Sequence, residues 1–331
     1  MAASTKQSDQ SWVKHPANPV LGGDYGTCFD ISVLQLDGTF RMYFSWRPKR
    51  AIAVAESVDG ITWSDPVIVL TPRDSDTPAG FENEVNRPSV VLVNGRYHMW
   101  YTGQHHPGRE GGRSWIGYAS SDDGVRWTRE LDEAVLAPIL PWEKVAVMCP
   151  HVLWDSRHRQ WKMWYSAGEQ YEPNAIGYAT SVDGITWQRW GAGPIFSASS
   201  DHSWEQHKVT ACQVLQHQDW YWMFYVGFHD EHRAQIGLAR SRDGVTGWER
   251  SPFNPIIYPT PGSWDEDACY KPFAVLESDR WLLWYNGRQA SVEQIGLVEC
   301  RGSSLNWDER DGSPSDPHHK AKIANLGEII A

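Results

Sequence analysis

Charged residues at one position of a repeated strand are the first candidates for chemistry in this sequence. Five apolar stretches align with one another, and the alignment places five different residues at one equivalent position: Asp30, Arg87, Cys149, Ala211 and Lys271. A charged side chain in an apolar strand is costly unless it is paired or hydrated. Structural residues recur from repeat to repeat, so we expect the three charged residues to form either a ligand site or a structural ion network.

Further polar candidates lie two residues along these strands and in the loops that should surround one mouth of the molecule. His151 occupies such a strand position, and Lys208 precedes the fourth of the aligned strands. The loops add Trp46, whose aromatic face suits a sugar ring, together with Arg47 and Arg288. We expect these residues to bind substrate alongside the two cations of the repeated strands.

Two glutamates are candidates for proton transfer. Glu169 follows a strand that should end near the axis, and no basic residue lies within five positions of it. Neighbouring aromatic residues such as Tyr171 could desolvate Glu169 and raise its pKa, as a proton donor near neutral pH requires. Glu84 lies three residues before Arg87, whose charge would lower the pKa of Glu84 and suit it to a base or an orienting role.

A repeat of about 60 residues must position these side chains. The motif SVDGITW at 57–63 returns at 121–127, 181–187 and 241–248, each time after an apolar strand, and QIGLVE at 294–299 is a fifth strand without the turn. Short strands at this spacing are typical of propeller blades. The Asp-Gly pair suits a tight turn, so we interpret this motif as structural. The Trp-Glu and Trp-Asp pairs at 142–143, 204–205 and 264–265 are interpreted as architecture because they recur in several units.

The two ends of the repeat region complement each other. Residues 11–21 resemble the outer strand of a unit, whereas the fifth unit ends after its third strand. We therefore expect an all-β, five-bladed β-propeller over residues 11–300, closed by the N-terminal strand, which removes exposed sheet edges. Residues 1–10 and 301–331 are expected to be an N-terminal and a C-terminal extension.

Composition narrows the classes of partner. The net charge of −11, without basic stripes, argues against nucleic acid and anionic membrane surfaces. The first ten residues lack an apolar core and no apolar run is long enough to span a bilayer, so a cytoplasmic location is expected. We expect no cofactor and no metal, because buried cysteines packing between strands explain four of the five cysteines more simply than a metal site does.

Residues 11–300 resemble the five-bladed propeller glycosidases of the β-fructosidase superfamily. They are most similar to glycoside hydrolase family 43, with some similarity to the family 130 mannoside phosphorylases. The resemblance lies in NPVLGG at 18–23 before an inner-strand Asp, in WYxG-type second strands and in IGYATSVDG-type third strands. It implies that Asp30 is the general base of an inverting enzyme or the nucleophile of a retaining one. The further acids of family 43 are missing, since the third and fourth inner strands carry Met148-Cys149-Pro150-His151 and Lys208-Val209-Thr210-Ala211.

Three functions follow from these observations. The first is a glycoside hydrolase that releases a terminal sugar, with furanoses such as arabinofuranose or fructofuranose among the candidates, from a short oligosaccharide or glycoside. Asp30 would act as base, and Glu169 or Glu84 as acid. The second is a family 130-like phosphorylase, in which the basic residues would bind phosphate. The third is a carbohydrate-binding propeller without turnover, which the missing acids would explain.

Overall fold

The computed structural model describes residues 11–73, 80–105, 112–169, 173–305 and 307, and these form an all-β structure. The predicted extension 1–10 and most of 301–331 lie outside the described residues. Three short 3-10 turns are the helical elements of the described part: η1 (Gly23–Tyr25), η2 (Arg47–Lys49) and η3 (Pro141–Glu143). Within these ranges no helix is both long and apolar enough to cross a bilayer.

The strands form four antiparallel-rich sheets. The first contains β2 (Cys28–Leu36), β3 (Thr39–Trp46), β4 (Ala51–Ser57) and β5 (Val67–Leu70). The second has nine strands: β6 (Glu84–Val93), β7 (Arg96–Gln104), β8 (Ser114–Ser121), β9 (Thr128–Arg129), β10 (Ala146–Asp155), β11 (Gln160–Gly168), β12 (Ala175–Ser181), β13 (Gln188–Arg189) and β14 (Phe196–Ser197). The third contains β15 (Lys208–His217), β16 (Trp220–Phe228), β17 (Ala234–Ser241) and β18 (Glu249–Arg250). The fourth contains β1 (Val13–Lys14), β19 (Ala268–Glu277), β20 (Arg280–Gln289) and β21 (Val292–Arg301).

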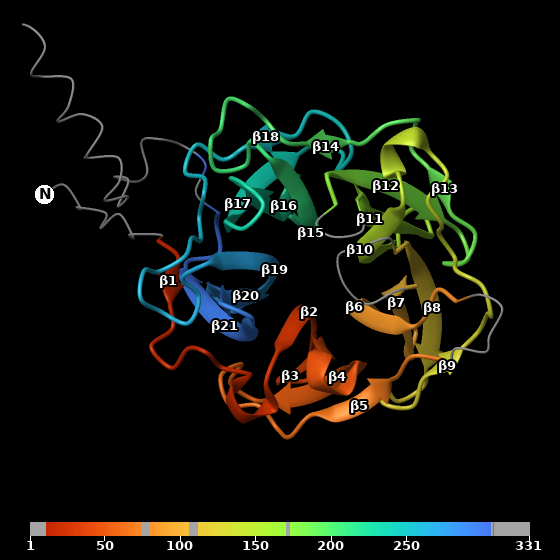
Figure 1. The fold of residues 1–331 in the computed structure, drawn as a ribbon, viewed down its shortest axis with the longest axis horizontal. Helices are drawn as coiled ribbons and strands as arrows, with labels where there is room; N and C mark the ends of the chain where they lie inside the picture. The colour runs from red at the N-terminus through yellow and green to blue at the C-terminus, as the bar shows by residue number, and fades with distance from the viewer. Residues whose placement is uncertain (1–10, 74–79, 106–111, 170–172, 306, 308–331) are drawn as a thin grey trace, which may run out of the picture.

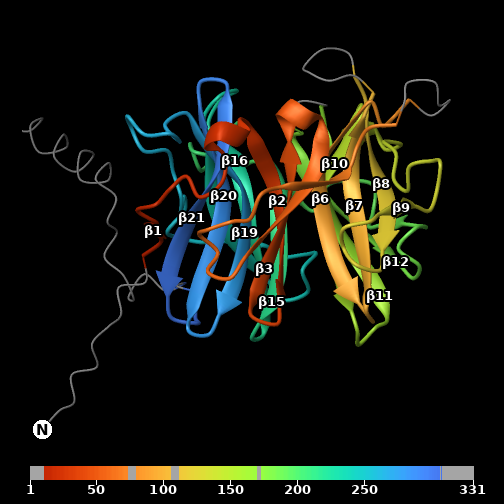
Figure 2. The same cartoon turned by 90° about the horizontal axis from the view of Figure 1, so that it is seen from below.

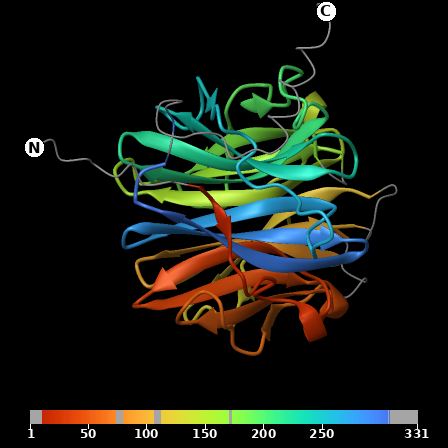
Figure 3. The same cartoon turned by 90° about the vertical axis from the view of Figure 1, so that its left-hand side faces the viewer.

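The sheets surround a common centre, with β2, β6, β10, β15 and β19 innermost, as Figure 1 shows. Their strands run between two faces of the molecule, as seen in Figure 2. β1 pairs with β21 through Val13 opposite Glu299, and it lies beside the strands of the last sheet in Figure 3. The first strand of the chain therefore belongs to the same sheet as the last strand, as residues 11–21 predicted.

Every innermost strand has a bulge at the same place. The register shifts between Phe29 and Ser32 in β2, and the corresponding shift recurs in β6, β10, β15 and β19. Inside each bulge lies one residue with a φ between 39° and 56°, namely Asp30, Arg87, Cys149, Ala211 or Lys271. Positive φ is uncommon outside glycine. The equivalence predicted for these five residues is therefore confirmed by the backbone.

The Asp-Gly turns link neighbouring units, as their interpretation as structural motifs predicts. In the first turn Asp59 Oδ1 accepts hydrogen bonds from the N–H groups of Ile61 and Thr62, and Gly60 has a φ of 75°. The indole of Trp284 donates to the Gly60 carbonyl at 2.9 Å. A Cβ at Gly60 would lie 2.8 Å from that indole, so the turn requires glycine for its conformation and for its close packing.

The hydrophobic core lies between adjacent sheets. Large buried side chains such as Trp100, Trp164 and Trp284 come from second strands and pack against the turn of the next unit. Alternation along these strands gives one face to each neighbouring sheet. The centre of the ring is left to the bulge residues of the innermost strands.

Candidate active site

The central pocket is lined by the bulge residues, and Asp30 is the carboxylate among them. Asp30 is 4% exposed, and its Oδ2 atom lies 3.4 Å from Arg87 Nε. That oxygen accepts no hydrogen bond from a described residue, although it is buried. The backbone N–H of Asp30 donates to Asn286 Oδ1 at 3.1 Å. A buried carboxylate oxygen with an unused lone pair can accept a proton from a bound water or substrate hydroxyl.

Lys271 is the second charged residue of the central pocket. It is 5% exposed and lies on β19, on the same pocket wall as Ala211 and Val226. Within the described part of the chain its side chain makes no hydrogen bond or ion pair. An ammonium that lines a pocket without a counter-ion from the described residues is available to an anionic ligand.

A second carboxylate enters this pocket from the last sheet. Glu293 on β21 accepts a hydrogen bond from the phenol of Tyr270, and its Oε2 atom lies 2.7 Å from Arg47. Burial raises the pKa of Tyr270, with the charges of Glu293 and Asp30 adding to the effect. Tyr270 therefore stays a neutral hydrogen-bond donor to Glu293.

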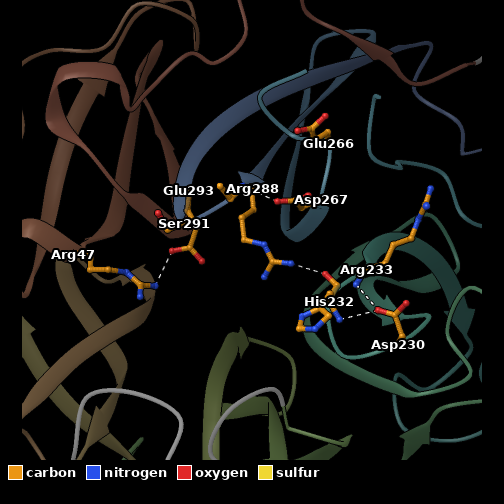
Figure 4. Close-up of a pocket in the computed structure, with 10 residues that line it drawn as sticks. Arg47, Asp230, His232, Arg233, Glu266, Asp267, Arg288, Ser291 and Glu293 are labelled. Atoms are coloured by element: carbon orange, nitrogen blue, oxygen red, sulfur yellow. Dashed lines mark hydrogen bonds and ion pairs between the residues drawn. The ribbon is translucent and has the colours of Figure 1, made fainter. Parts of the chain in front are cut away.

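Above the central pocket lies a wider one, shown in Figure 4, with a cavity volume of about 600 Å³. It shares Arg47 and Glu293 with the central pocket, so these two residues lie at the junction. Arg288 points across it and donates to the His232 carbonyl at 2.5 Å. Asp230 is turned away to the backbone, where it accepts from two N–H groups that lower its pKa. The arginines thus present donors to whatever occupies the mouth.

Four other buried carboxylates repeat around the ring, at the Trp-Glu and Trp-Asp pairs and the matching Phe-Glu pair. Each contacts a buried tyrosine hydroxyl and a cation from an outer strand: Glu82 with Tyr101 and Arg129, Glu143 with Tyr165 and Arg189, Glu205 with Tyr225 and Arg250, and Asp265 with Tyr285 and Lys14. This recurrence assigns them to the architecture, as the sequence predicted.

Glu169 does not have the environment that the sequence predicted. Its side chain is 56% exposed, and Lys144 Nζ lies 3.1 Å from its Oε1 atom. The hydrogen bond from Lys144 lowers the pKa of Glu169, against a weaker opposing effect of burial. The expected rise in its pKa was therefore wrong, because a lysine 25 positions earlier in the chain folds back beside it. Glu169 lines neither of the two pockets described above.

Glu84 begins β6 opposite Gln104 and also lies outside the lining of both pockets. The neighbour that its predicted role depends on, Arg87, turns toward Asp30 and also donates to Asn86 Oδ1 at 2.8 Å. Arg87 is therefore the partner of Asp30 in the central pocket. Glu84 has neither this partner nor a position on the lining of either pocket.

His151 has a structural environment. It is buried, and its Nε2 atom lies 2.6 Å from the carbonyl of Val214 on the next innermost strand. Burial lowers its pKa to about 4, the hydrogen bond to Val214 opposes this, and the charge of Lys271 adds to it. The equivalent residue Gln213 bonds Ala274 of the following strand in the same way. His151 and Gln213 thus each join their own innermost strand to the next one. The geometry therefore favours a structural role for His151 over contact with substrate.

The remaining predicted binding residues are divided between the mouth and its surroundings. Arg47 and Arg288 line the wide pocket. Trp46 packs edge-on against Tyr25 and donates its indole N–H to the Tyr25 carbonyl at 2.8 Å. Lys208 is buried at the start of β15, and its charge contributes to the lowered pKa of Glu169. Trp46 and Lys208 therefore lie beside the pockets and do not line them.

Sequence reasoning missed Glu293 and Tyr270. Glu293 lies at the end of a loop that the sequence singled out, residues 286–293, but no motif distinguished it from other loop acids. Tyr270 precedes Lys271 in the aligned strand, and comparing that column between repeats would have found a tyrosine where Phe29, Asn86, Met148 and Thr210 stand elsewhere. Among the described residues no cluster of histidine, cysteine and acidic side chains is placed to hold a metal ion.

Comparisons with known proteins identify what this arrangement is similar to. The family model described as glycosyl hydrolases family 43 matches residues 16–309. An uncharacterised protein of Mycobacterium tuberculosis, Rv1502, is 28% identical over 245 residues, which cover 68% of this chain and 76% of that protein.

Solved structures share the fold at low sequence identity. A glycoside hydrolase has a TM-score of 0.70 at 19% identity, covering 94% of this chain and 96% of its own. A thermostable family 43 glycoside hydrolase has a TM-score of 0.64 at 15% identity, covering 92% and 99%. A family 130 structure, from a family of mannoside phosphorylases that contains hydrolases of β-1,2 mannosidic linkages, has a TM-score of 0.66 at 14% identity, covering 94% and 98%.

Proposed function

The chain belongs to glycosyl hydrolase family 43, and from that premise we propose that it releases a terminal sugar from a short oligosaccharide or glycoside bound across its two pockets. Hydrolysis of a glycosidic bond needs two groups. One protonates the leaving oxygen, and the other activates a water molecule or attacks the anomeric carbon. The pockets offer a carboxylate for each role, Asp30 in the centre and Glu293 at the junction.

The observation that supports this function most strongly is the position of Asp30. It is the one acidic residue among five equivalent bulges, and its Oδ2 atom is buried without a hydrogen-bond donor from the described residues. The other buried carboxylate oxygen of the described residues without a hydrogen bond, Glu82 Oε2, has close ion pairs with Arg129 at 2.8 Å and Arg73 at 2.9 Å, whereas Asp30 Oδ2 lies 3.4 Å from Arg87. We assign Asp30 the role of base or nucleophile, which agrees with the resemblance of its motif to the first-blade aspartate of family 43.

Glu293 is our candidate for the proton donor, in place of Glu169 and Glu84. Glu293 lines both pockets. If the terminal sugar reaches into the central pocket and the leaving group lies in the wide pocket, the glycosidic bond between them lies beside Glu293. Its partner Arg47 is 57% exposed, and water screens the attraction between an exposed guanidinium and a carboxylate. Hydrogen bonds of catalytic groups often rearrange when substrate binds, which leaves Glu293 free to turn to the leaving oxygen.

We also propose that the nine-stranded sheet represents two blades, because one parallel pair, Ala146 with Ser114, joins its halves. Counted in this way, residues 11–300 form a five-bladed catalytic propeller in which β1 completes the last blade. Deleting residues 11–21 tests this: the shortened chain should unfold or aggregate, since its last sheet gains an open edge. A well-folded monomer after this deletion would contradict closure by β1.

The hydrolase activity is tested with a panel of 4-nitrophenyl glycosides that includes α-L-arabinofuranoside and pyranosides, with release of 4-nitrophenol as the readout. At least one member should be turned over, and Asp30→Asn should abolish that turnover without unfolding the protein. Sugar binding by calorimetry without turnover of any glycoside would instead indicate a carbohydrate-binding propeller. A furanoside preference over matched pyranosides would support release of a furanose.

A further inference from the structure

The charges of the central pocket do not balance among themselves. Asp30 is paired with Arg87 at 3.4 Å, and Glu293 is paired with Arg47 at 2.7 Å. Lys271 is the remaining charged residue of the lining, and within the described ranges it has no hydrogen-bonding or ionic partner. The pocket lining therefore carries one positive charge more than its carboxylates neutralise.

The groups nearest to Lys271 do not supply the missing negative charge. Its charge acts on His151, whose pKa burial lowers to about 4, and on Cys212, whose pKa burial raises to about 12. Both groups are therefore neutral near pH 7. The Lys271 ammonium thus lines the pocket beside neutral groups, where a bound anion can accept its hydrogen bonds.

The repeat is also broken at this place on the polypeptide backbone. At four of the five bulges the backbone N–H donates to a side chain on the second strand of the preceding unit: Ser45 for Arg87, Thr102 for Cys149, Ser166 for Ala211 and Asn286 for Asp30. At the fifth bulge, that of Lys271, this position is occupied by Val226, which has no acceptor. Among the described residues, the bulge of Lys271 therefore lacks the hydrogen bond from its backbone N–H to a side chain of the preceding unit that the other four bulges have.

We propose that the central pocket receives the carboxylate of an acidic sugar, with the Lys271 ammonium as its counter-ion. This assignment of a substrate class rests on the proposed glycosidase function. One surplus positive charge matches a monoanion better than a phosphate, which carries a charge of about −1.5 to −2 near pH 7. The cavity volume of the central pocket is about 40 Å³. That is roughly three times what one water needs, which suits a small substituent, while the sugar ring occupies the wider mouth.

The negative net charge of the protein does not prevent binding of an acidic sugar. The net charge of −11 would repel an anion at low ionic strength. At physiological salt the Debye length is about 8 Å, so distant surface charges are screened, whereas Lys271 acts at contact distance. Binding of an acidic sugar should therefore strengthen with salt over the low range and depend on Lys271 throughout.

The test compares matched pairs of substrates that differ in the carboxylate alone, namely 4-nitrophenyl β-D-glucuronide with the glucoside and 4-nitrophenyl β-D-galacturonide with the galactoside. The wild-type protein should favour the acidic member in kcat/KM by about 10- to 100-fold, the range expected for one charge-assisted hydrogen bond. Lys271→Met should remove this preference, and Lys271→Arg should retain part of it. Equal kcat/KM values for acidic and neutral members would overturn the proposal.

Lys162→Met is the matched control, because Lys162 is another buried lysine but is paired with Asp155 at 2.7 Å. Lys162→Met should lower stability and leave the substrate preference unchanged. Lys271→Met should be about as stable as the wild-type protein, since within the described residues no ion pair is lost with the Lys271 ammonium. Loss of the preference in both variants would contradict a specific role for Lys271.

Binding of free sugars tests the carboxylate site at Lys271 independently of the proposed glycosidase activity. Glucuronate or galacturonate should raise the Tm of the wild-type protein, whereas glucose and galactose should not, and Lys271→Met should respond to neither kind. A uronate-dependent Tm shift without turnover of any glycoside would support the carboxylate site and reject the glycosidase assignment. If addition of inorganic phosphate yields a sugar phosphate in place of the free sugar, the anion site belongs to phosphate and the acidic-sugar proposal is overturned.

Discussion

The protein contains two groups of buried carboxylates that differ in how completely they are paired. In the outer group each carboxylate meets a tyrosine hydroxyl and a cation, as Glu143 does with Tyr165 at 2.9 Å and Arg189 at 2.7 Å. In the central pocket, Asp30 faces Arg87 at 3.4 Å and its Oδ2 atom accepts no hydrogen bond from the described residues. Burial is therefore common to both groups, and the longer ion pair distinguishes Asp30 from the outer carboxylates, whose cations lie within 2.9 Å.

The pKa shifts within the outer group have no common direction. Burial alone would raise the pKa of Glu143, but Arg189 and the N–H groups of Leu140 and Ile139 lower it. For Glu205 burial prevails over Tyr225 and Arg250, and the pKa is raised. The same local architecture thus tolerates shifts in both directions, since neither carboxylate reaches a pocket. A shifted pKa by itself would have pointed to the wrong residues.

The largest expected effect separates the two groups by activity. Asp30→Asn should lower kcat about 100- to 10,000-fold on any glycoside that the wild-type protein hydrolyses, because a positioned base contributes that much. Its thermal unfolding midpoint should fall less than that of a variant in the outer group, since the ion pair lost with Arg87 is 3.4 Å long and that of Glu143 with Arg189 is 2.7 Å. Near-wild-type kcat in a folded Asp30→Asn variant would place Asp30 with the structural carboxylates.

The converse result is expected in the outer group. Glu143→Gln should destabilise the protein by about 3–5 kcal/mol, because it leaves the Arg189 guanidinium buried without a counter-charge. Urea unfolding measures this loss. Folded Glu143→Gln protein should keep the kcat of the wild type at low temperature. A large fall in kcat with stability intact would show that the outer carboxylates take part in the chemistry.

The pH dependence of stability tests the structural role of His151. Its pKa is about 4 in the folded protein, against the ordinary value of 6.5, so the unfolded chain binds more protons between these values. Unfolding free energy should therefore fall by roughly 3 kcal/mol as the pH drops from about 6.5 to about 4.

The matched variant is His151→Gln, because Gln213 fills the equivalent position and donates to Ala274 O at 2.8 Å. Urea unfolding at pH 7 and pH 5 should show a smaller loss of stability on acidification in His151→Gln than in the wild-type protein. An unchanged pH dependence would mean that other groups account for it.

The smallest expected effect concerns the proton donor. Glu293→Gln should reduce kcat/KM about 100-fold on an alkyl glycoside, whose leaving group needs a proton, and far less on a 2,4-dinitrophenyl glycoside. Glu169→Gln is the matched control and should affect both substrates little, since Glu169 is exposed and paired with Lys144. Selective loss on the alkyl glycoside in Glu169→Gln, and not in Glu293→Gln, would restore the assignment that the sequence favoured.

The amino-acid sequence alone determined the features that depend on local pattern. Period-two strands, Asp-Gly turns and the repeat of about 60 residues predicted the all-β fold, and the pairing of residues 11–21 with β21 followed from the missing outer strand. The alignment of repeats also placed Asp30, Arg87 and Lys271 at equivalent bulges. These inferences succeeded because a strand fixes which residues share a face, and a repeat copies that geometry from unit to unit.

The tertiary structure decided which of these residues meet. Asp30 and Asn286 are 256 positions apart in the chain, yet their side chains come within hydrogen-bonding distance. Lys144 beside Glu169, and Glu293 beside Tyr270, likewise arise from loops that fold together at the mouth. The sequence pattern of a strand shows a charged residue, but it does not show whether a counter-ion from another strand lies opposite. Pairing is a property of the tertiary structure, because only the folded chain brings separate strands to one centre and removes their side chains from water.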